Sequence, residues 1–407
     1  MFILNVINSE VAHFKNLSQK ARSLTWSILL YQLANVSIWI FMIAYMVQKS
    51  NQIEIPAIFA LGFYITMPIA FIWAAFLLKK YSLKNVSLFG LAGMGIMTLI
   101  LFWMQDLNTT TVFIYGLFYG LPMGLYWATR NFIFSAEITD AHRDYVSGFT
   151  GSVGSITSTI IPLIIGWVIA LSPSFGWEKV SIYRLIAFIS MCFYIIAGLI
   201  IKKKSTLNPI INKLWLKNPS KQWKTFRLFT FLGSIQFTLA LALPGALIIT
   251  YIGDEGILGT IIGITSLVSG LCLYILGRLK NAAENRTKIL LFGLIPLIIS
   301  SLLLLVSFNY LSIMIYLVIM IVFDKLYWFV FFPIFFNQVE KNSDQGVTND
   351  YRLIMDQEIF INLGRALMSL VYLFLIFKFD NKTAITIIIL LAAVSQIGIL
   401  GLAKKLK

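Results

Sequence analysis

The stretch Tyr115-Gly-Leu-Phe-Tyr-Gly-Leu-Pro-Met-Gly-Leu-Tyr-Trp127 lies in a long apolar run, which is followed by the pair Asp144-Tyr145 and a second apolar run. The same order returns later as Leu326-Tyr327-Trp328, then Asp350-Tyr351 and another apolar run. Tyr327 follows Tyr126 by 201 residues, and Tyr351 follows Tyr145 by 206 residues. This spacing predicts an internal repeat, in which a long apolar helix reaches a short polar loop and a second helix returns.

The composition indicates a membrane protein, because 59% of the 407 residues are hydrophobic and only 12% are charged. Soluble globular domains average about 25% charged residues. A bilayer is spanned by about 20 apolar residues in a helix. Twelve stretches approach that length, which predicts an all-α membrane protein with twelve transmembrane helices, at 24–47, 55–78, 84–104, 111–137, 146–171, 181–201, 225–250, 257–277, 287–308, 311–339, 352–377 and 383–402.

The two copies of the repeat fall in the fourth and the tenth apolar stretch, six stretches apart. This predicts two pseudo-symmetric six-helix halves, at 1–201 and 225–407, an arrangement found in secondary transporters. The connection, 202–224, is basic and carries apolar residues at helix-like spacing, namely Leu207, Ile210, Ile211, Leu214 and Trp215. We expect it to form an interfacial helix on the membrane surface.

The net charge of +15 follows the expected membrane topology. When Lys and Arg that lie outside the twelve stretches, or within their first four residues, are assigned to alternating sides, 24 fall on one side and five on the other. Lys and Arg accumulate on the cytoplasmic side of membrane proteins, so we expect both termini in the cytoplasm and the chain in the cytoplasmic (inner) membrane. The basic residues then contact anionic lipids rather than nucleic acid. We expect the protein to be a monomer.

The loop after the second stretch, Ala75-Phe-Leu-Leu-Lys-Lys-Tyr-Ser-Leu-Lys84, resembles the signature of the major facilitator superfamily. Three residues fit that signature (Leu77, Lys80 and Lys84), and three depart from it (Ala75, Lys79 and Ser82). The eleventh stretch also resembles a group of bacterial facilitators at Glu358, Gly364 and Arg365, while Gln357 replaces the arginine of that pattern. The resemblance implies the fold of twelve helices in two halves and the transport of a small molecule by alternating access.

Ionisable residues inside the tenth and eleventh stretches are the strongest candidates for a functional site. Asp324 and Lys325 lie near the middle of the tenth stretch, where a charge costs about 2.5–3.5 kcal/mol. The eleventh carries one polar stripe, made of Tyr351, Glu358, Asn362, Arg365, Ser369 and Tyr372. Such a stripe must face protein or water rather than lipid.

Two interpretations of these charges are open. In one, Asp324 pairs with Arg365, or Lys325 with Glu358, and the ion pairs only fix helix packing. In the other, the stripe lines a translocation cavity. There Asp324, with Glu358 as second candidate, binds and releases a coupling proton, and Lys325, Asn362 and Arg365 bind an anionic or polar group of the substrate.

Further candidates for substrate binding come from the other copy of the repeat and from amides within spans. They are Gln32 and Asn35 in the first stretch, Gln236 in the seventh, Tyr119, Tyr126 and Arg130 on one face of the fourth, and Trp328 in the tenth. The alternatives are that the amides only bond neighbouring helices, and that the aromatic face only packs and ends in an arginine that reaches the membrane surface.

The sequence favours a secondary active transporter, proton-coupled and with an amphipathic or anionic substrate. A transporter-like receptor or scaffold without transport activity is the alternative. We do not expect an enzyme, a metal or a cofactor. The only two histidines, His13 and His142, lie outside the stretches, there is no phosphate-binding loop, and Cys192 and Cys272 lie within spans.

Overall fold

The structure is a computed structural model that describes residues 14–138, 140–203, 214–277, 285–343 and 351–406. The described residues form helices and no strand. The helices of the first half of the chain are α2 (Gln19–Ser50), α3 (Ile55–Lys80), α4 (Leu83–Trp103), α5 (Thr109–Glu137), α6 (Asp140–Leu171), the short η1 (Ser172–Phe175) and α7 (Lys179–Lys203). Those of the second half are α8 (Lys221–Leu247), η2 (Ile248–Ile252), α9 (Glu255–Gly277), α10 (Arg286–Val306), α11 (Tyr310–Asn342), α12 (Tyr351–Lys378), α13 (Asn381–Ser395) and α14 (Ile397–Lys405).

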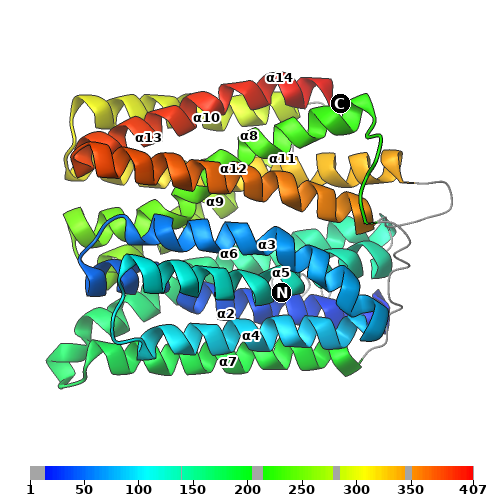
Figure 1. Ribbon diagram of the computed structural model, residues 1–407, viewed down its shortest axis with the longest axis horizontal. Helices are drawn as coiled ribbons and strands as arrows, with labels where there is room; N and C mark the ends of the chain where they lie inside the picture. The colour runs from blue at the N-terminus through cyan, green and yellow to red at the C-terminus, as the bar shows by residue number, and fades with distance from the viewer. Residues whose placement is uncertain (1–13, 139, 204–213, 278–284, 344–350, 407) are drawn as a thin grey trace, which may run out of the picture.

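The helices run along one common direction and form a bundle (Figure 1). In the described part of the chain, eleven helical segments are long and apolar enough to cross a membrane. Helix α5, which corresponds to the predicted stretch 111–137, is not among them, because glycine, threonine and tyrosine residues lower its hydropathy. It nevertheless runs beside α3 through the length of the bundle (Figure 1).

Two predicted segments differ from what the structure shows. The last predicted stretch, 383–402, is divided at Gln396 into α13 and α14. In the predicted linker 202–224, α7 continues to Lys203 and α8 begins at Lys221, and residues 214–220 between them are not helical. The rest of the predicted interfacial helix, 204–213, lies outside the described residues. The division into two halves stays a proposal, although α2–α7 and most later helices occupy different sides of the bundle in Figure 1.

The ends of α5 and α11 extend the repeat beyond the residues that predicted it. Asn108 accepts a hydrogen bond from the backbone of Thr111 at the start of α5, and the Thr111 side chain bonds back to Asn108. Asn309 and Ser312 form the same capping box at the start of α11. Asn309 follows Asn108 by 201 residues, the offset that separates Tyr327 from Tyr126. Equivalent caps therefore begin equivalent helices.

Small residues bring particular helices close together. A methyl group at Gly116 of α5 would collide with the carbonyl oxygen of Phe59 in α3. In the same way, a methyl group at Gly259 of α9 would collide with the carbonyl oxygen of Pro162 in α6. Close backbone approach of this kind stabilises helix pairs in membranes through packing rather than through the hydrophobic effect. The α6–α9 and α3–α12 pairs make the most extensive contacts between the first six helices and the later ones.

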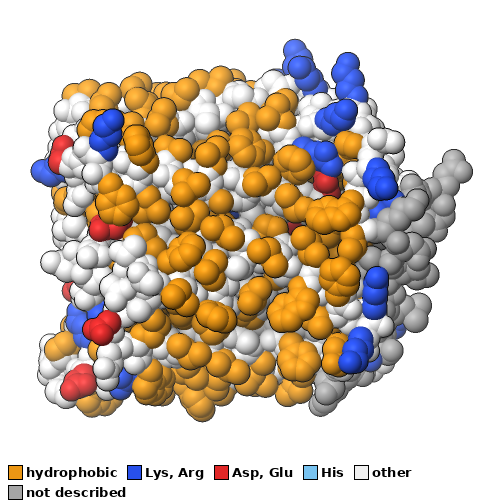
Figure 2. All heavy atoms as spheres, in the orientation of Figure 1, with side chains coloured by type: hydrophobic (Ala, Val, Ile, Leu, Met, Phe, Trp, Pro, Cys, Tyr) orange, Lys and Arg blue, Asp and Glu red, His pale blue; other side chains and the backbone are white. Residues whose placement is uncertain are grey.

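The surface has the distribution of side chains that a bilayer requires. Apolar side chains cover the middle of the bundle, and Lys and Arg gather at one end (Figure 2). We call this the basic end; there α3 ends at Lys80, α8 begins at Lys221 and α14 ends at Lys405. Large apolar side chains such as Phe89, Ile264 and Phe292 are more than half exposed. An apolar surface of this kind is stable in contact with lipid tails, so the chain is a multi-pass membrane protein.

Candidate functional site

The repeated Tyr-Trp pair packs in the same way in both parts of the chain. The rings of Tyr126 and Trp127 in α5 lie 4.4 and 5.9 Å from the ring of Tyr31 in α2. The rings of Tyr327 and Trp328 in α11 lie 5.3 and 4.6 Å from the ring of Phe237 in α8. Each pair thus contacts an aromatic residue of the first helix in its part of the chain, and these contacts build two aromatic clusters.

Arg365, near the middle of α12, connects one cluster to the other part of the molecule. The carbon atom of its guanidinium group lies 5.2 Å from the ring centre of Tyr64 in α3 and 5.3 Å from that of Phe237 in α8. Both distances are those of cation–π contacts. The Nε atom of Arg365 is buried and has no hydrogen-bond partner among the described residues. The guanidinium group therefore retains a donor for another molecule.

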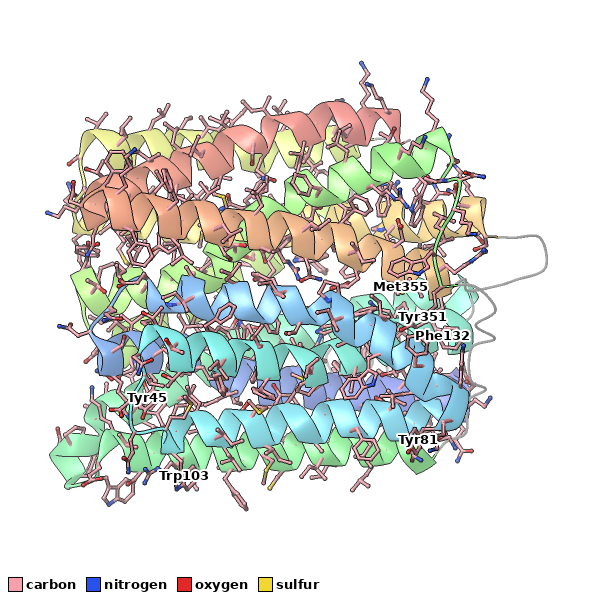
Figure 3. All side chains as sticks on the ribbon, in the orientation of Figure 1. Tyr45, Tyr81, Trp103, Phe132, Tyr351 and Met355 are labelled. Atoms are coloured by element: carbon pink, nitrogen blue, oxygen red, sulfur yellow. The ribbon has the colours of Figure 1, made fainter. Side chains whose placement is uncertain are left out.

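Contacts at two further levels hold α3 and α12 together. Near the basic end, the hydroxyl group of Tyr351 donates a hydrogen bond of 2.8 Å to the carbonyl oxygen of Phe71 (Figure 3). Near the opposite end, the hydroxyl group of Tyr372 donates a hydrogen bond of 3.5 Å to the carbonyl oxygen of Ile53, in the turn just before α3. Tyr351 and Tyr372 belong to the predicted polar stripe, so the stripe faces α3 and not lipid.

Asp324 has a buried carboxylate oxygen, Oδ1, without a hydrogen-bond partner in the described part of the chain. Lys325 and Arg365 are close enough to interact with it electrostatically. Yet no ion pair within 4.0 Å joins any of Asp324, Lys325, Glu358 and Arg365 among the residues described. The two ion pairs that the packing interpretation named, Asp324 with Arg365 and Lys325 with Glu358, are therefore not formed in the described part of this structure. The charges are close but not in contact.

Glu358 has a different environment from Asp324. The amide nitrogen of Asn362 donates a hydrogen bond of 2.9 Å to Oε1 of Glu358, one turn earlier in α12. Both side chains are buried. The amide oxygen of Asn362 is left without a partner in the described structure. Glu358 is therefore already engaged by its own helix, whereas Asp324 is not.

Most of the predicted polar residues share the feature seen in Asp324. Buried polar atoms without a partner among the described residues occur in Gln32, Tyr119, Tyr126, Gln236, Asp324, Asn362 and Arg365. Asn35 differs, because its oxygen accepts a 3.4 Å hydrogen bond from Tyr194. Buried polar groups are normally hydrogen-bonded. Tyr119 lies beside Thr98, Tyr126 beside Arg130 and Gln236 beside Tyr316 of α11, so these groups have polar neighbours although no hydrogen bond of normal geometry forms. Water or a polar solute can satisfy the unpaired atoms of Gln32, Asp324, Asn362 and Arg365.

Arg130 and Lys325 lie beside members of this set, Tyr126 and Asp324, but are not among the residues with buried unpaired atoms. The guanidinium group of Arg130 lies 4.8 Å from the ring centre of Trp127 and 5.7 Å from that of Phe134. It also donates a hydrogen bond of 3.1 Å to Asn131. These contacts fit the packing interpretation of Arg130. Lys325 is exposed, unlike Asp324 beside it.

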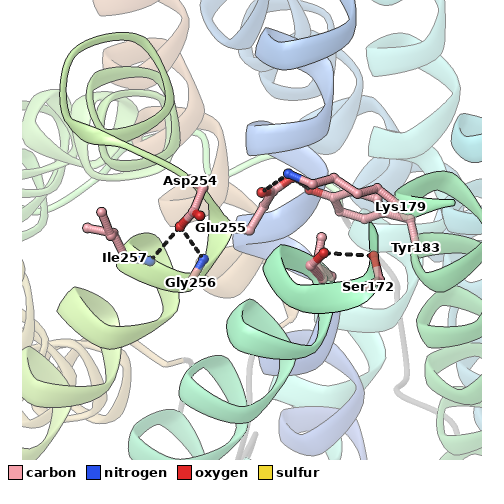
Figure 4. Close-up of polar contacts among 8 residues, drawn as sticks. Ser172, Lys179, Tyr183, Asp254, Glu255, Gly256 and Ile257 are labelled. Carbon is pink, nitrogen blue, oxygen red and sulfur yellow. Dashed lines mark hydrogen bonds and ion pairs between the residues drawn. The ribbon is translucent and has the colours of Figure 1, made fainter. Parts of the chain in front are cut away.

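Two buried ion pairs were missed in the sequence. In α12, Asp356 accepts hydrogen bonds from Arg227 (2.7 Å, from Nε) and from Trp223 (2.6 Å), both in α8. At the end of the bundle opposite the basic end, Lys179 of α7 forms an ion pair of 2.8 Å with Glu255 of α9, which also accepts a hydrogen bond from Tyr183 (Figure 4). We call Lys179, Tyr183 and Glu255 the end clasp.

A signal for Asp356 was present, since it lies two residues before Glu358 inside an apolar helix. The position of Arg227 did not suggest a buried partner for Asp356. It lies near the start of a predicted span, so its charge was counted among the basic residues of one membrane side. Glu255 lies at the start of its helix, where acidic residues are common, and only the fold brings Lys179 to it. Among the described residues, no group of three or more His, Cys, Asp or Glu side chains is placed to hold a metal ion.

This architecture, with a polar centre enclosed by apolar helices, is that of a membrane transporter. A sequence profile of the Major Facilitator Superfamily matches residues 24–351, and the chain belongs to that family. A curated relative, the uncharacterized protein YqgE of Bacillus subtilis (strain 168), is 24% identical over 261 residues, which are 63% of this chain and 59% of the relative. The aligned region thus spans less than two thirds of that relative's length.

Solved structures support the same fold. A bacterial homologue of the iron transporter ferroportin, in the outward-facing state with soaked iron, superposes with a TM-score of 0.62 at 13% identity. The match covers 95% of this chain and 98% of the other. A second structure of such a homologue, also outward-facing, gives a TM-score of 0.61 at 13% identity, with 95% and 99% coverage. At this identity the likeness concerns the fold alone.

Proposed function

We propose that this chain is a proton-coupled secondary active transporter that moves a small molecule with an anionic group by alternating access. The observation that carries the proposal is Asp324 near the middle of α11, whose Oδ1 atom is buried and has no hydrogen-bond partner among the described residues, with Arg365 close by. An apolar environment favours the neutral form of a carboxyl group, while a nearby cation favours the ionised form. A change in their separation between two states would therefore load and release a proton.

Arg365 supplies the other half of the mechanism. Its guanidinium group contacts Tyr64 of α3 and Phe237 of α8, so a relative movement of the two parts of the chain must alter its surroundings. A substrate anion that accepts a hydrogen bond from its free Nε would draw the arginine away from Asp324, which would then take up a proton. Gln32, Gln236 and Asn362 offer further hydrogen bonds to the polar part of the substrate.

The orientation belongs to the same proposal. The basic end faces the cytoplasm, in accordance with the distribution of Lys and Arg in membrane proteins, and both termini lie there. We place the chain in the cytoplasmic membrane as a monomer, with the two six-helix halves 1–201 and 225–407 moving against each other. The basic side chains contact anionic lipid headgroups.

The proposal is tested with purified protein in liposomes that contain the pH-sensitive dye pyranine. Small carboxylates, phosphomonoesters and single-chain alkyl phosphates are added one at a time, without an imposed gradient. We expect at least one compound to change the internal pH in the presence of the protein and not in empty liposomes. If compounds bind the protein but none is transported, the receptor or scaffold alternative holds instead. Transport without any change of internal pH would contradict proton coupling.

A further inference from the structure

An apolar groove lies between α9 and α11 at the end of the bundle opposite the basic end. It has a volume of about 270 Å³, and its walls include Trp167 of α6, Ile261, Ile264 and Thr265 of α9, and Met314 and Val318 of α11. Ile264 and Trp167 are 56% and 44% exposed, so the groove opens at the surface that meets lipid. It therefore faces the membrane and not water.

The groove exists because α9 packs closely on α6 rather than on α11. Methyl groups at Gly259 and Gly263 of α9 would collide with α6, at the carbonyl oxygens of Pro162 and Thr159. In the other copy of the repeat, the equivalent pair is α3 and α5, whose glycines bring the two backbones together. In the second copy, α9 corresponds to α3 and α11 corresponds to α5. Because α9 is held against α6, a gap remains between α9 and α11.

A charged residue of α11, Lys325, lies beyond the groove on the same face of the helix. Met314, Val318 and Lys325 are separated by four and seven residues, which places them on one face of the helix. Lys325 lies about 10 Å further along the helix axis than Val318, at 1.5 Å per residue. It is exposed, near the middle of a membrane-spanning helix. A cation at this depth needs an anionic or polar partner.

Thr265 adds a polar atom to the inner wall of the groove. Its side chain is fully buried, and its hydroxyl oxygen has no hydrogen-bond partner in the described part of the molecule. Ordinary lipid tails cannot satisfy a hydroxyl group. The groove therefore has an apolar surface for a chain, together with polar groups at defined positions for a head group.

We propose that this groove is a lateral entrance from the membrane, and that its occupant is the transported substrate, a single-chain amphipathic anion. The alkyl chain lies against Ile261, Ile264 and Met314, and the anionic group pairs with Lys325 beside Asp324. This inference rests on the proposed function and names its substrate class. The charge of Lys325 complements an anion, and the apolar wall from Tyr310 to Val318 on the same side of α11 complements a chain rather than a compact solute.

The test is photocrosslinking of the protein in nanodiscs made of zwitterionic lipid. The probe is hexadecyl phosphate with a diazirine in its chain, and crosslinked peptides are identified by mass spectrometry. We expect crosslinks on α9 and α11 that unlabelled hexadecyl phosphate suppresses and hexadecanol does not. Lys325→Gln should weaken probe binding about tenfold or more, as the loss of a hydrogen bond to a charged group predicts. Lys325→Arg should retain it.

Two further variants separate the groove from general lipid contact. Val318→Trp fills the groove and should abolish the crosslinks, while Ile295→Trp, on the exposed face of α10, should leave them unchanged. Suppression by hexadecanol, or equal binding by Lys325→Gln, would show that the groove holds ordinary lipid and would overturn the proposal. Binding at equilibrium needs no proton gradient. The two proposals can therefore fail separately. If the probe does not bind in the groove while another anion changes the internal pH in the liposome assay, the lateral entrance is wrong and the proposed transport function stands.

Discussion

In proteoliposomes, Asp324→Asn should reduce transport driven by a pH gradient to the level of empty liposomes. Asparagine has almost the same shape as aspartate but cannot carry a titrating proton, so the helix packing around α11 should persist. Because Oδ1 of Asp324 has no partner among the described residues, the substitution breaks no hydrogen bond at that atom. Exchange of labelled for unlabelled substrate across the membrane should continue, since it needs movement of the loaded protein only.

Glu358→Gln is the matched comparison. Glu358 is also buried, but Asn362 already donates a hydrogen bond to it, and a glutamine oxygen can accept the same bond. We therefore expect Glu358→Gln to retain most of the pH-driven transport. If Asp324→Asn, at equal protein level, keeps the full pH-driven rate, or if Glu358→Gln abolishes it, Asp324 has a structural role and the coupling site lies elsewhere.

Joining α7 to α9 across the end clasp should stop transport almost completely. Lys179 and Glu255 come from the two proposed halves, and their ion pair of 2.8 Å joins α7 to α9 at one end of the bundle. Alternating access requires this end to open. A cleavable bis-maleimide between Lys179→Cys and Glu255→Cys, with Cys192 and Cys272 replaced by serine, should hold it closed. Cleavage of the linker by a reducing agent should restore the rate.

The control for the clasp is a crosslink within one proposed half. Lys49 of α2 contacts the carbonyl oxygen of Met104, at the end of α4, at the same end of the bundle. Lys49→Cys and Met104→Cys joined by the same reagent should leave transport intact, since both helices move together. Full transport with the end clasp crosslinked would show that α7 and α9 do not separate, and the proposed movement of two halves would be wrong.

The repeat and the spans could be predicted because each rests on local pattern. The Tyr-Trp pairs recur at a fixed offset, and both pack on an aromatic residue of an earlier helix, Tyr31 and Phe237, as a repeat predicts. The break at Gln396 could not be predicted, since no proline or glycine precedes it within α13; its side chain bonds the carbonyl oxygen of Leu232 instead. Tertiary contacts of this kind leave no periodic signal in the sequence.

The candidate site was predictable in its residue types but not in its pairings. Asp324 and Arg365 were identified because a charge inside an apolar run is costly. That they lie close without forming an ion pair depends on how α11 and α12 are placed, which the sequence does not contain. Asp356 was missed although it is the carboxylate of α12 that forms an ion pair, because its partner Arg227 resembled a surface charge. The roles of the twelve predicted residues stay predictions.

The measurement that tests proton coupling most directly is the substrate ratio at which net transport stops. Proteoliposomes are prepared with a fixed pH gradient and with the membrane potential clamped at zero by valinomycin and equal potassium. The substrate found in the pyranine assay is then varied on one side. With one proton per substrate, each unit of pH difference should shift the balancing ratio about tenfold. If net transport always stops when the substrate concentrations on the two sides are equal, whatever the pH gradient, the protein is not a proton-coupled transporter.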